Sequence, residues 1–531
     1  MLALAWLVWG LSLVVNMERA EEQPSIDPWP AEFLERMRGW LGSEADDFFA
    51  ALARRDIGLR LNSLRGPLDS LRARIPWSNI PVPWCPEGIW LQPEDTEAAY
   101  TEAEYVNAEP GEVPRRSRAG QPGEKVSAGV HPYHTAGVYY IQDPSAMAAA
   151  VILAPKPGEW VLDVAAAPGG KATHLAARMQ NQGVLVANDV SRRRVPVLAM
   201  NLERMGVTNA LITNEYPDRL AARWGRMFDA VLVDAPCSGE GMFSRDSQAA
   251  QEWSLASIQG NARRQRIIME QSAPLLCPGG RLLYGTCTFA PEENESIIAD
   301  FLAEHPEFEL ADLPRLPGLG PGQPVVSLSN HLSNEPECGT MLGELRRTGR
   351  FWPHTGPGHG HFYALLRRKG NLSHNLPVRW TGTQVPGRVM HLYRQALGKV
   401  LSAPPPEEGL MLSKDDVLYI TPMEPKLWDG LRVLRPGWWI ASLRHGRVKP
   451  DHALAMALKP EEARATHSLP LDDMGGQSPH IHKFLRGDFW ADRGPAGWVL
   501  VTVEGFPLGW GKRGGGRLRS RYPIHLRRGT H

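Results

Sequence analysis

The sequence predicts an α/β protein whose centre is a doubly wound parallel sheet, with a small α+β domain before it and an α+β or β module after it. Three observations favour this fold class. Short apolar runs alternate with amphipathic stretches from about residue 131 to residue 369, as parallel strands joined by helices do. A loop of small residues and glycines, AAAPGGK, follows one of these runs. The length of 531 residues exceeds one compact domain, so two or three domains are expected.

Residues 1–16, MLALAWLVWGLSLVVN, are an apolar leader. The run is shorter than the roughly 20 residues that a membrane-spanning helix needs. No positive charge precedes it and no clear A-x-A cleavage site follows it, which disfavours a signal peptide. We expect the natural chain to start at Met17 and the leader to be non-native or disordered.

Residues 17–130 are predicted to form the small α+β domain. The segments PAEFLERMRGWL and ADDFFAALAR carry apolar residues at helical spacing, and GLRLNSLRG follows as an extended segment. From Glu94 to Val130 the sequence is polar and rich in Glu, Pro, Gly and Arg, which predicts a loop or linker.

Residues 131–369 carry the alternating pattern of the central sheet. Its predicted strands are Trp160–Val164, Val184–Asn188, Ala210–Thr213, Phe228–Val233 and Arg281–Gly285. Helices are predicted at Lys171–Met179 and Ala262–Leu276. After a passage rich in Pro and Gly, HGHFYALLRRKG is expected to supply a last strand.

Residues 370–531 contain no second nucleotide-type loop and are predicted to be a separate module. The whole chain has 58 basic and 58 acidic residues, which argues against a uniformly cationic protein but allows a local patch. Such a patch lies near the end of the chain, where no acidic residue interrupts Lys512, Arg513, Arg517, Arg519, Arg521, Arg527 and Arg528. Trp510 and Tyr522 are interleaved with these cations. Cations pair with phosphates and aromatic rings stack on bases, so nucleic-acid binding is favoured over a merely solvated tail.

A nucleotide site is predicted at the loop formed by Ala165, Ala166, Ala167, Pro168, Gly169, Gly170 and Lys171. Small residues let the backbone approach a ligand, and the following helix offers unpaired N–H groups at its N-terminus. Asp189 ends the next strand, twenty residues beyond Gly169, where an acidic residue accepts hydrogen bonds from ribose hydroxyls. An adenosine-containing cofactor is therefore expected. The loop is not GxGxxG, which weakens a nicotinamide cofactor without excluding it.

Two cysteines are expected at the same crevice as this loop. Asp234 ends the fourth strand and is followed by Pro236 and Cys237, while Cys287 lies just past the fifth strand. The carboxyl ends of parallel strands face one crevice, so the two thiols and Asp234 should lie together. Cys277 is expected to be a core residue.

No metal site is predicted, because the five cysteines include no CxxC. His131 and His134 have HxxH spacing but no matching third ligand. The scattered cysteines suit a reducing, cytosolic setting rather than a disulfide framework.

Three segments together carry a resemblance to a known family. They are AAAPGGK at 165–171, DAPCSGEGMF at 234–243 and GTCTFAPEENE at 285–295. In kind, order and spacing they resemble the RNA 5-methylcytosine methyltransferases that use S-adenosyl-L-methionine. HTAGVYYIQDPSAM looks like the segment before that family's cofactor loop, and both ends of the chain after Met17 resemble the type that acts on small-subunit ribosomal RNA.

The resemblance implies a Rossmann-like methyltransferase domain at 131–369, an N-terminal RNA-binding domain at 17–130 and a PUA-like RNA-binding module at 370–531. It also implies that Ala165 to Lys171, Asp189 and Asp234 contact S-adenosyl-L-methionine.

The chemistry agrees with the resemblance on independent grounds. Carbon 5 of cytosine becomes a sufficient nucleophile after a thiolate has added to carbon 6. In the family, the Thr-Cys cysteine is the nucleophile and the Pro-Cys cysteine assists release. By resemblance Cys287 therefore attacks, Cys237 helps expel the product, and Asp234 is expected to hydrogen-bond the base. DNA cytosine methyltransferases attack from a Pro-Cys pair, so the reversed assignment remains an alternative.

One departure from the family concerns the third strand. Many relatives place an Asp there to contact the cofactor, whereas this chain has Tyr216 at the corresponding spacing. Glu215 or Asp218 are alternatives for that role. Arg192 to Arg194 either touch RNA or cover the start of a helix.

We expect a cytoplasmic, monomeric RNA cytosine-5 methyltransferase that acts on 16S rRNA and needs neither a metal nor a membrane. The residues alone do not separate rRNA from tRNA, so a tRNA methyltransferase is one alternative. A catalytically inactive RNA-binding factor for ribosome assembly and a nucleotide-dependent oxidoreductase are two others.

Overall fold

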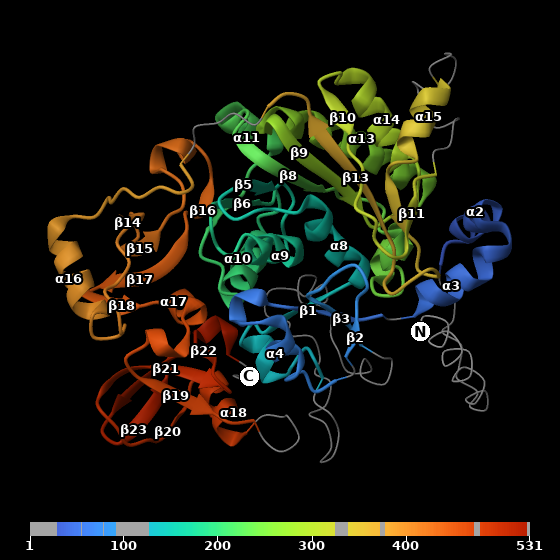
Figure 1. Ribbon diagram of the computed structural model, residues 1–531. Coiled ribbons are helices and arrows are strands. Elements are labelled where there is room, and N and C mark those ends of the chain that lie inside the picture. The colour runs from blue at the N-terminus through green and yellow to red at the C-terminus, as the bar shows by residue number, and fades with distance from the viewer. Residues whose placement is uncertain are drawn as a thin grey trace, which may run out of the picture.

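The computed structural model describes residues 29–54, 56–77, 79–91, 127–323, 338–371, 377–471 and 478–527. Figure 1 shows the N-terminal helices at one side of the central sheet and the two C-terminal units at the other, while the small N-terminal sheet lies below the central sheet in this view and shares a hydrophobic core with the last C-terminal unit. The predictions for the leader, the Met17 start, most of the polar segment before Val130, and Arg528 lie outside the described residues. In the part of the chain that the structure describes, no helix is long and apolar enough to cross a membrane.

The N-terminal region contains the two predicted helices and a small antiparallel sheet. The helices are α2 (Ala31–Leu41), α3 (Ala45–Ala53), α4 (Leu68–Arg72) and α7 (Pro132–Thr135). The sheet order is β2-β3-β1-β4, formed by β1 (Gly58–Leu61), β2 (Ile80–Pro81), β3 (Gly88–Trp90) and β4 (Tyr139–Gln142). Phe33 and Phe48 of the first two helices pack against Phe243 and Phe289, whose ring centroids lie 5.0 Å away in both pairs. The N-terminal helices therefore cover the loops that carry Cys237 and Cys287.

The central region is the predicted parallel sheet. Its order is β11-β12-β13-β9-β8-β5-β6-β7-β16, with β10 added beside β13. The parallel strands are β5 (Trp160–Asp163), β6 (Val184–Asn188), β7 (Ala210–Thr213), β8 (Phe228–Asp234) and β9 (Leu276–Thr286). Antiparallel strands at the far edge are β10 (Phe308–Leu310), β11 (Leu319–Pro321), β12 (Gly349–Phe351) and β13 (His361–Arg368). The fold class is confirmed.

Helices cover both faces of this sheet, and each face has its own buried core. One layer contains α8 (Pro144–Leu153), α9 (Gly170–Arg178) and α10 (Val195–Arg204), and the other contains α11 (Pro217–Trp224), α13 (Leu255–Ser272) and α14 (Glu295–Glu304). The shorter α12 (Ser247–Glu252) and α15 (Cys338–Leu345) complete the region.

Three boundaries in this region differ from the prediction by several residues, and one of them is the end of α13, at Ser272 rather than Leu276. β9 begins at Leu276 rather than Arg281, because Leu276 pairs with Phe228 across a register shift. α13 begins at Leu255 rather than Ala262, because Ser254 caps it and accepts a hydrogen bond from the Ser257 N–H.

The C-terminal region consists of two units and a strand that joins the central sheet. The first unit has α16 (Gly387–Leu397), α17 (His452–Ala457) and the sheet β14 (Leu410–Leu412), β15 (Val417–Ile420), β17 (Trp438–Arg444) and β18 (Arg447–Pro450). The second has α18 (Pro479–Arg486) and the sheet β19 (Thr466–Leu469), β21 (Gly497–Val503), β22 (Phe506–Gly514), β23 (Arg517–Ser520) and β20 (Phe489–Ala491). Between β15 and β17 of the first unit, β16 (Val433–Arg435) pairs with β7 and covers what would be an open edge of the central sheet.

The basic end of the chain lies largely within this second sheet, so it is not a free tail. Because side chains alternate between the faces of a strand, Lys512, Arg517 and Arg519 are exposed, whereas Arg513 is buried and ion-paired to Asp492 at 2.7 Å. The expectation that Trp510 and Tyr522 are available to stack on bases is wrong, since they are 2% and 7% exposed. Both rings are needed for packing.

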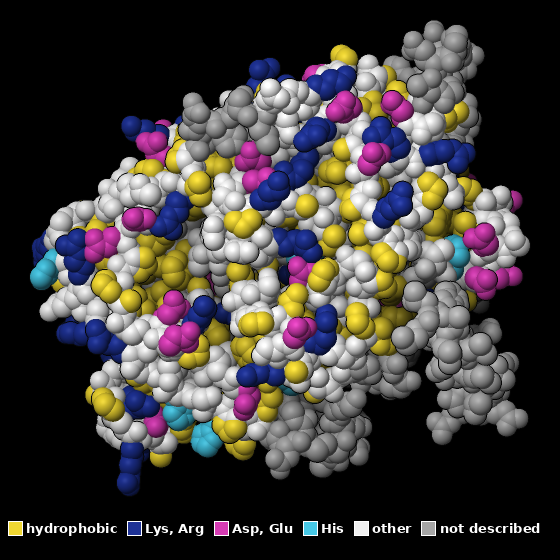
Figure 2. Space-filling model, in the orientation of Figure 1, with side chains coloured by type: hydrophobic (Ala, Val, Ile, Leu, Met, Phe, Trp, Pro, Cys, Tyr) yellow, Lys and Arg dark blue, Asp and Glu magenta, His cyan; other side chains and the backbone are white. Residues whose placement is uncertain are grey.

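The face drawn in Figure 2 carries Lys, Arg, Asp and Glu side chains mixed over the central and C-terminal regions. This mixture fits the equal numbers of basic and acidic residues in the sequence.

Candidate active site

The small-residue loop at 165–171 connects β5 to α9 and is held by its backbone. The Ala166 N–H donates to the Asn188 carbonyl at 2.6 Å, and the Asn201 side chain donates to the Pro168 carbonyl at 2.9 Å. Gly169 has a φ of 118°, and a Cβ there would lie 3.3 Å from both Asn201 and Leu198. The loop therefore needs glycine because it follows the surface of α10 closely.

Asp189 follows β6 and lies against this loop, as the sequence predicts. Its side chain is 2% exposed, and its two carboxylate oxygens accept hydrogen bonds from the Ser191 N–H at 2.8 Å and the Ala167 N–H at 3.2 Å. Arg194 also donates to the Ala167 carbonyl and lies 3.7 Å from Asp189. Arg194 thus braces the loop, while Arg192 and Arg193 are exposed.

Asp163 ends β5 immediately before the loop, and the sequence analysis overlooked it. Its side chain is 1% exposed, and among the described residues no group makes a hydrogen bond of good geometry to its carboxylate oxygens, although the Ala165 N–H lies close enough to lower its pKa. Burial, and then the charge of Asp234, raise the pKa of Asp163 to about 8, against the opposing charge of Lys171. The signal that could have revealed it is a carboxylate at the carboxyl end of an otherwise apolar strand.

Asp234 and Lys171 form an ion pair at the carboxyl edge of the sheet. Lys171 Nζ lies 2.6 Å from Asp234 Oδ2, and the two side chains are 14% and 29% exposed. Although burial opposes it, the charge of Asp234 and the hydrogen bond to it raise the pKa of Lys171. The pair joins the cofactor loop to the segment that leads to Cys237.

Cys237 and Cys287 lie side by side, as expected from the topology. Their Sγ atoms are 3.4 Å apart, and both residues are half-buried. The pairing follows from the register of β8 and β9, in which Asp234 stands opposite Gly285. The hydrogen bond with Cys287, followed by burial, raises the pKa of the Cys237 thiol well above its ordinary value.

The remaining cysteine prediction in this region is also confirmed. Cys277 lies in β9 and is fully buried, and burial raises the pKa of its thiol to about 11. It is therefore a core residue and takes no part in the crevice.

The three candidates for the third-strand position differ in their exposure to solvent. Glu215 is 7% exposed, and its Oε1 accepts a hydrogen bond from the Arg432 N–H at 2.7 Å, so the C-terminal region engages it. Tyr216 is 66% exposed, and Asp218 is exposed in the first turn of α11.

Two histidines considered for metal binding have structural roles. His131 caps α7 by accepting a hydrogen bond from the Tyr133 N–H at 3.1 Å, and it packs against Trp77. His134 lies against Tyr139, with ring centroids 5.9 Å apart.

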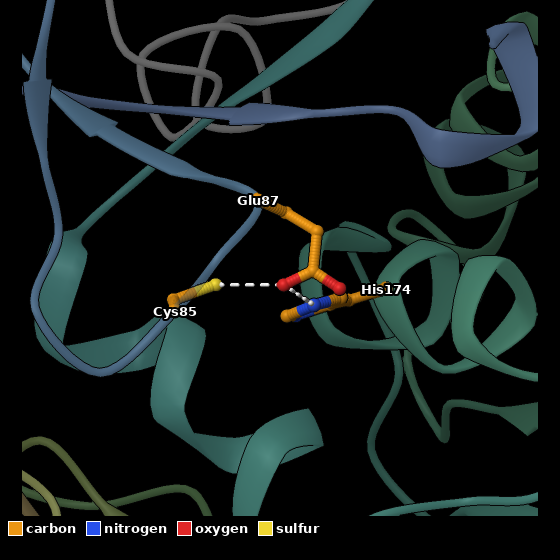
Figure 3. A group of neighbouring side chains, drawn as sticks. All are labelled: Cys85, Glu87 and His174. Atoms are coloured by element: carbon orange, nitrogen blue, oxygen red, sulfur yellow. Dashed lines mark hydrogen bonds and ion pairs between the residues drawn. The ribbon is translucent and has the colours of Figure 1, made fainter. Parts of the chain in front are cut away.

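A different group, Cys85, Glu87 and His174, brings three potential metal ligands together in the N-terminal half (Figure 3). Arg178 already uses two of them: its guanidinium lies 2.9 Å from Glu87 Oε2, and its Nε donates to His174 Nε2 at 3.2 Å. Burial lowers the pKa of His174 to about 3 and raises that of Cys85 to about 12. The group therefore links the N-terminal sheet to α9, the helix that follows the cofactor loop.

Family models match this chain along most of its length. A family model described as 16S rRNA methyltransferase RsmB/F matches residues 150–367. Three further models match the flanking regions: the N-terminal domain of 16S rRNA methyltransferase RsmF at 29–108, the first C-terminal domain of RsmF rRNA methyltransferase at 397–458, and the methyltransferase RsmF PUA domain at 474–528.

Curated relatives match over almost the whole chain. Proteins named ribosomal RNA small subunit methyltransferase F from Citrobacter koseri and from Enterobacter sp. strain 638 are each 31% identical, covering 94% of this chain and 96% of the relative. The crystal structure of NSun6 from Pyrococcus horikoshii shares the fold, with a TM-score of 0.50 and 22% identity over 65% of this chain and all of that one. The resemblance found in the sequence is confirmed: this chain belongs to the RsmB/F family of 16S rRNA methyltransferases.

Proposed function

We propose that the protein is an S-adenosyl-L-methionine-dependent RNA methyltransferase that modifies carbon 5 of cytosine in 16S rRNA. The observation that carries this proposal is the pair of Cys237 and Cys287 thiols, 3.4 Å apart beside the Asp234–Lys171 ion pair. The names of the relatives, which describe methyltransferases of small-subunit rRNA, support the choice of substrate.

The residues around the small-residue loop fit S-adenosyl-L-methionine, which supplies an electrophilic methyl group when bound. Asp189 would accept hydrogen bonds from the ribose hydroxyls, and the N–H groups of the loop would lie close to the cofactor. Asp163 supports the same fit, because a buried carboxyl group with a raised pKa is stabilised in its charged form by a cationic ligand. The methionine end of the cofactor carries such charge.

Cys287 is the proposed nucleophile. Cys287 stands in the Thr-Cys motif, while the hydrogen bond with Cys287 and burial raise the pKa of Cys237 and favour its neutral thiol. Cys287 adds to carbon 6 of the flipped base, and carbon 5 then accepts the methyl group. Asp234, held by Lys171, hydrogen-bonds the edge of the base and stabilises the charge that develops there. Loss of the carbon 5 proton and expulsion of Cys287 complete the cycle, with Cys237 promoting release.

RNA binding is proposed for both flanking regions, with boundaries at 17–130 and 370–531 around the catalytic region at 131–369. The exposed face of the last sheet supports this proposal. Trp498, Lys512, Arg519 and Phe489 are successive cross-strand partners, which places two adjacent cations between two aromatic rings along one row. Phe489 is 52% exposed, and the Arg517 guanidinium lies 4.9 Å from its ring centroid, so the exposed part of the ring can stack on a base beside a cation. We further propose that the protein acts as a monomer in the cytosol.

The test is bisulfite sequencing of total RNA from cells with and without the gene, together with methyl transfer by the purified protein to small ribosomal subunits and to tRNA. Loss of a 5-methylcytosine in 16S rRNA is expected. A methylation map that does not change would contradict the activity. Modification of tRNA alone would keep the reaction and replace the substrate.

A further inference from the structure

Two loops carry the cysteines, and each also carries a buried glutamate. The Pro-Cys loop, residues 235–243, contains Cys237 and Glu240, and the Thr-Cys loop, residues 286–294, contains Cys287 and Glu293. The glutamates are 1% and 0% exposed. Neither belongs to the residues proposed above to touch the cofactor or the base.

Glu240 reaches from the Pro-Cys loop to the Thr-Cys loop. Its Oε2 accepts hydrogen bonds from Thr288 Oγ1 at 2.9 Å and from the Phe289 N–H at 2.8 Å. Its Oε1 accepts a hydrogen bond from Trp253 Nε1 at 2.9 Å. Both carboxylate oxygens are therefore used as acceptors, and two of the three hydrogen bonds come from the residues directly after Cys287.

Glu293 reaches in the opposite direction. Its Oε2 accepts hydrogen bonds from the Ser238 N–H at 3.0 Å and from Gln265 Nε2 at 2.9 Å. The same Gln265 amide donates to the Pro236 carbonyl at 2.9 Å, so the residues on both sides of Cys237 are held.

Two direct contacts lie between these carboxylates. The Gly241 N–H donates to the Cys287 carbonyl at 2.9 Å, and the hydroxyls of Ser238 and Thr288 are 2.8 Å apart. Each loop is thus bound to the other through its own glutamate side chain and through these two direct hydrogen bonds.

Burying two carboxyl groups next to each other opposes folding, and apolar side chains of the same volume would fill the space at a lower free energy. Burial raises the pKa of Glu240, and burial with the charge of Glu240 raises the pKa of Glu293 to about 7. The strands β8 and β9 are already paired, so these carboxylates are not needed to form the sheet. What they add is a defined position for the loops beyond the strand ends.

We propose that Glu240 and Glu293 form a reciprocal carboxylate clasp, in which each positions the loop that carries the other and together they hold Cys237 beside Cys287. They are positioning residues that act through the two thiols. The negative charge of Glu293 also disfavours ionisation of Cys237, which keeps that group a neutral thiol beside the nucleophile.

The clasp predicts an asymmetry between two substitutions of the same kind. In Glu240→Gln, the new amide group has to face either Trp253 Nε1–H or the Thr288 and Phe289 donors, so one donor meets another. In Glu293→Gln, the amide oxygen can take the place of Oε2 and accept the two shorter hydrogen bonds, so only the longer one, from the same Ser238 N–H to Oε1 at 3.4 Å, is lost. Glu240→Gln and Glu293→Ala should therefore separate the thiols, whereas Glu293→Gln should not.

The test measures the thiol pair directly with phenylarsine oxide. This trivalent arsenical bridges two neighbouring thiols: two As–S bonds form, and the oxygen leaves as water with both thiol protons. Binding to the Cys237–Cys287 pair is the part of the binding that the Cys237→Ser variant loses. The affinity of this binding should fall at least about tenfold in Glu240→Gln and Glu293→Ala. In Glu293→Gln and in the surface control Glu304→Gln it should stay within about twofold of the wild type.

A kinetic arm rests on the proposed function. The kcat for methylation should fall at least about tenfold in Glu240→Gln, while the KM for S-adenosyl-L-methionine changes little because the cofactor loop is untouched. Absence of methylation by the wild-type protein would contradict the proposed function and leave the arsenical result intact. Unchanged arsenical affinity in Glu240→Gln and Glu293→Ala, or no bridging in the wild type, would overturn the clasp.

If Glu240→Gln fails to fold, Thr288→Val tests the same contact with a smaller change. It removes one donor to Glu240, and Thr288→Ser restores that donor. The clasp requires weaker arsenical binding in the valine variant and recovery in the serine variant. Equal weakening in both would show that Thr288 acts through packing alone and would overturn the proposal.

Discussion

The cofactor side and the cysteine side of the crevice are built in different ways. On the cofactor side, the loop at 165–171 is fixed by glycine conformation and through its own backbone groups, to which the side chains of Asp189, Arg194 and Asn201 are hydrogen-bonded. On the cysteine side, the two loops are fixed by buried side chains that come from separate parts of the chain, including Trp253 and Gln265. The cofactor loop depends on small residues, whereas the thiol pair depends on a network of acceptors and donors. The two halves should therefore respond differently to substitution.

The largest effect is expected for the cysteines themselves. Cys287→Ala should reduce methylation to less than about one thousandth of the wild-type rate and form no covalent RNA adduct, because no thiolate adds to carbon 6. Cys237→Ala should instead accumulate a protein–RNA adduct, because the methylated intermediate forms but is not released. Gel electrophoresis under denaturing conditions after incubation with RNA and cofactor separates the two outcomes. An adduct in Cys287→Ala would reverse the roles.

The second prediction breaks the cysteine side and leaves the cofactor side intact. In Gly241→Ala, the new Cβ would lie 2.7 Å from the His359 carbonyl oxygen and 2.9 Å from that of Cys287, so the two loops have to move apart. The kcat for methylation should fall by about 100-fold, since displacements near 1 Å have effects of that size. Binding of S-adenosyl-L-methionine, measured by calorimetry, should be retained.

Gly260→Ala is the matched control for Gly241→Ala. A Cβ at Gly260, within α13, meets a single neighbouring atom, Arg263 Nη2, at 4.0 Å. The alanine should leave catalysis unchanged and stabilise the helix slightly. A loss of activity in Gly260→Ala equal to that in Gly241→Ala would mean that steric contact is not the cause.

The third prediction breaks the cofactor side alone. Gly169→Ala places a Cβ 3.3 Å from Asn201 and Leu198 at a residue whose φ is 118°, so the loop has to shift. The Kd for S-adenosyl-L-methionine should rise about tenfold, because strain of this kind has a free energy of about 1–3 kcal/mol. Arsenical binding to the thiol pair should not change. Equal losses in both measurements would show that the two sides of the crevice are one coupled unit.

The same division explains what the sequence made predictable. The loop at 165–171, Asp189 and the two cysteines follow strands whose apolar pattern is local, so their meeting at one edge follows from parallel topology. The glutamates 240 and 293 lie within recognisable motifs, yet their acceptor roles depend on partners that are distant in sequence.

Regions outside the crevice also depend on partners that are distant in sequence. The pairing of β16 with β7 joins segments about 220 residues apart, and no local pattern in either segment specifies its partner. Likewise, Trp510 lies near cations in the sequence, as an RNA-stacking residue would, but packing against α17 and Trp498 buries it. Local patterns thus predicted the strands and their ends, and tertiary contacts decided which side chains remained available.

The smallest expected effect concerns Asp163, which lies where the two sides meet. Because the folded-state pKa of Asp163 is raised to about 8, above its ordinary value, its contribution to stability is present at low pH and is lost as the pH rises toward 8. Burial is the largest cause of the raised pKa, and the charges that face Asp163 are Asp234 and Asp189, which raise it further, and Lys171, which lowers it. Asp163→Asn keeps the shape and cannot ionise, so its melting temperature relative to the wild type should increase by roughly 2–4 °C between pH 5 and pH 9 in the cofactor-free protein.

The cofactor's positive charge favours the ionised carboxylate, so adding S-adenosyl-L-methionine at pH 9 should stabilise the wild type more than the variant. A difference in melting temperature that does not depend on pH would show that Asp163 is not protonated at low pH in the folded protein, and would remove it from the proposed cofactor contacts.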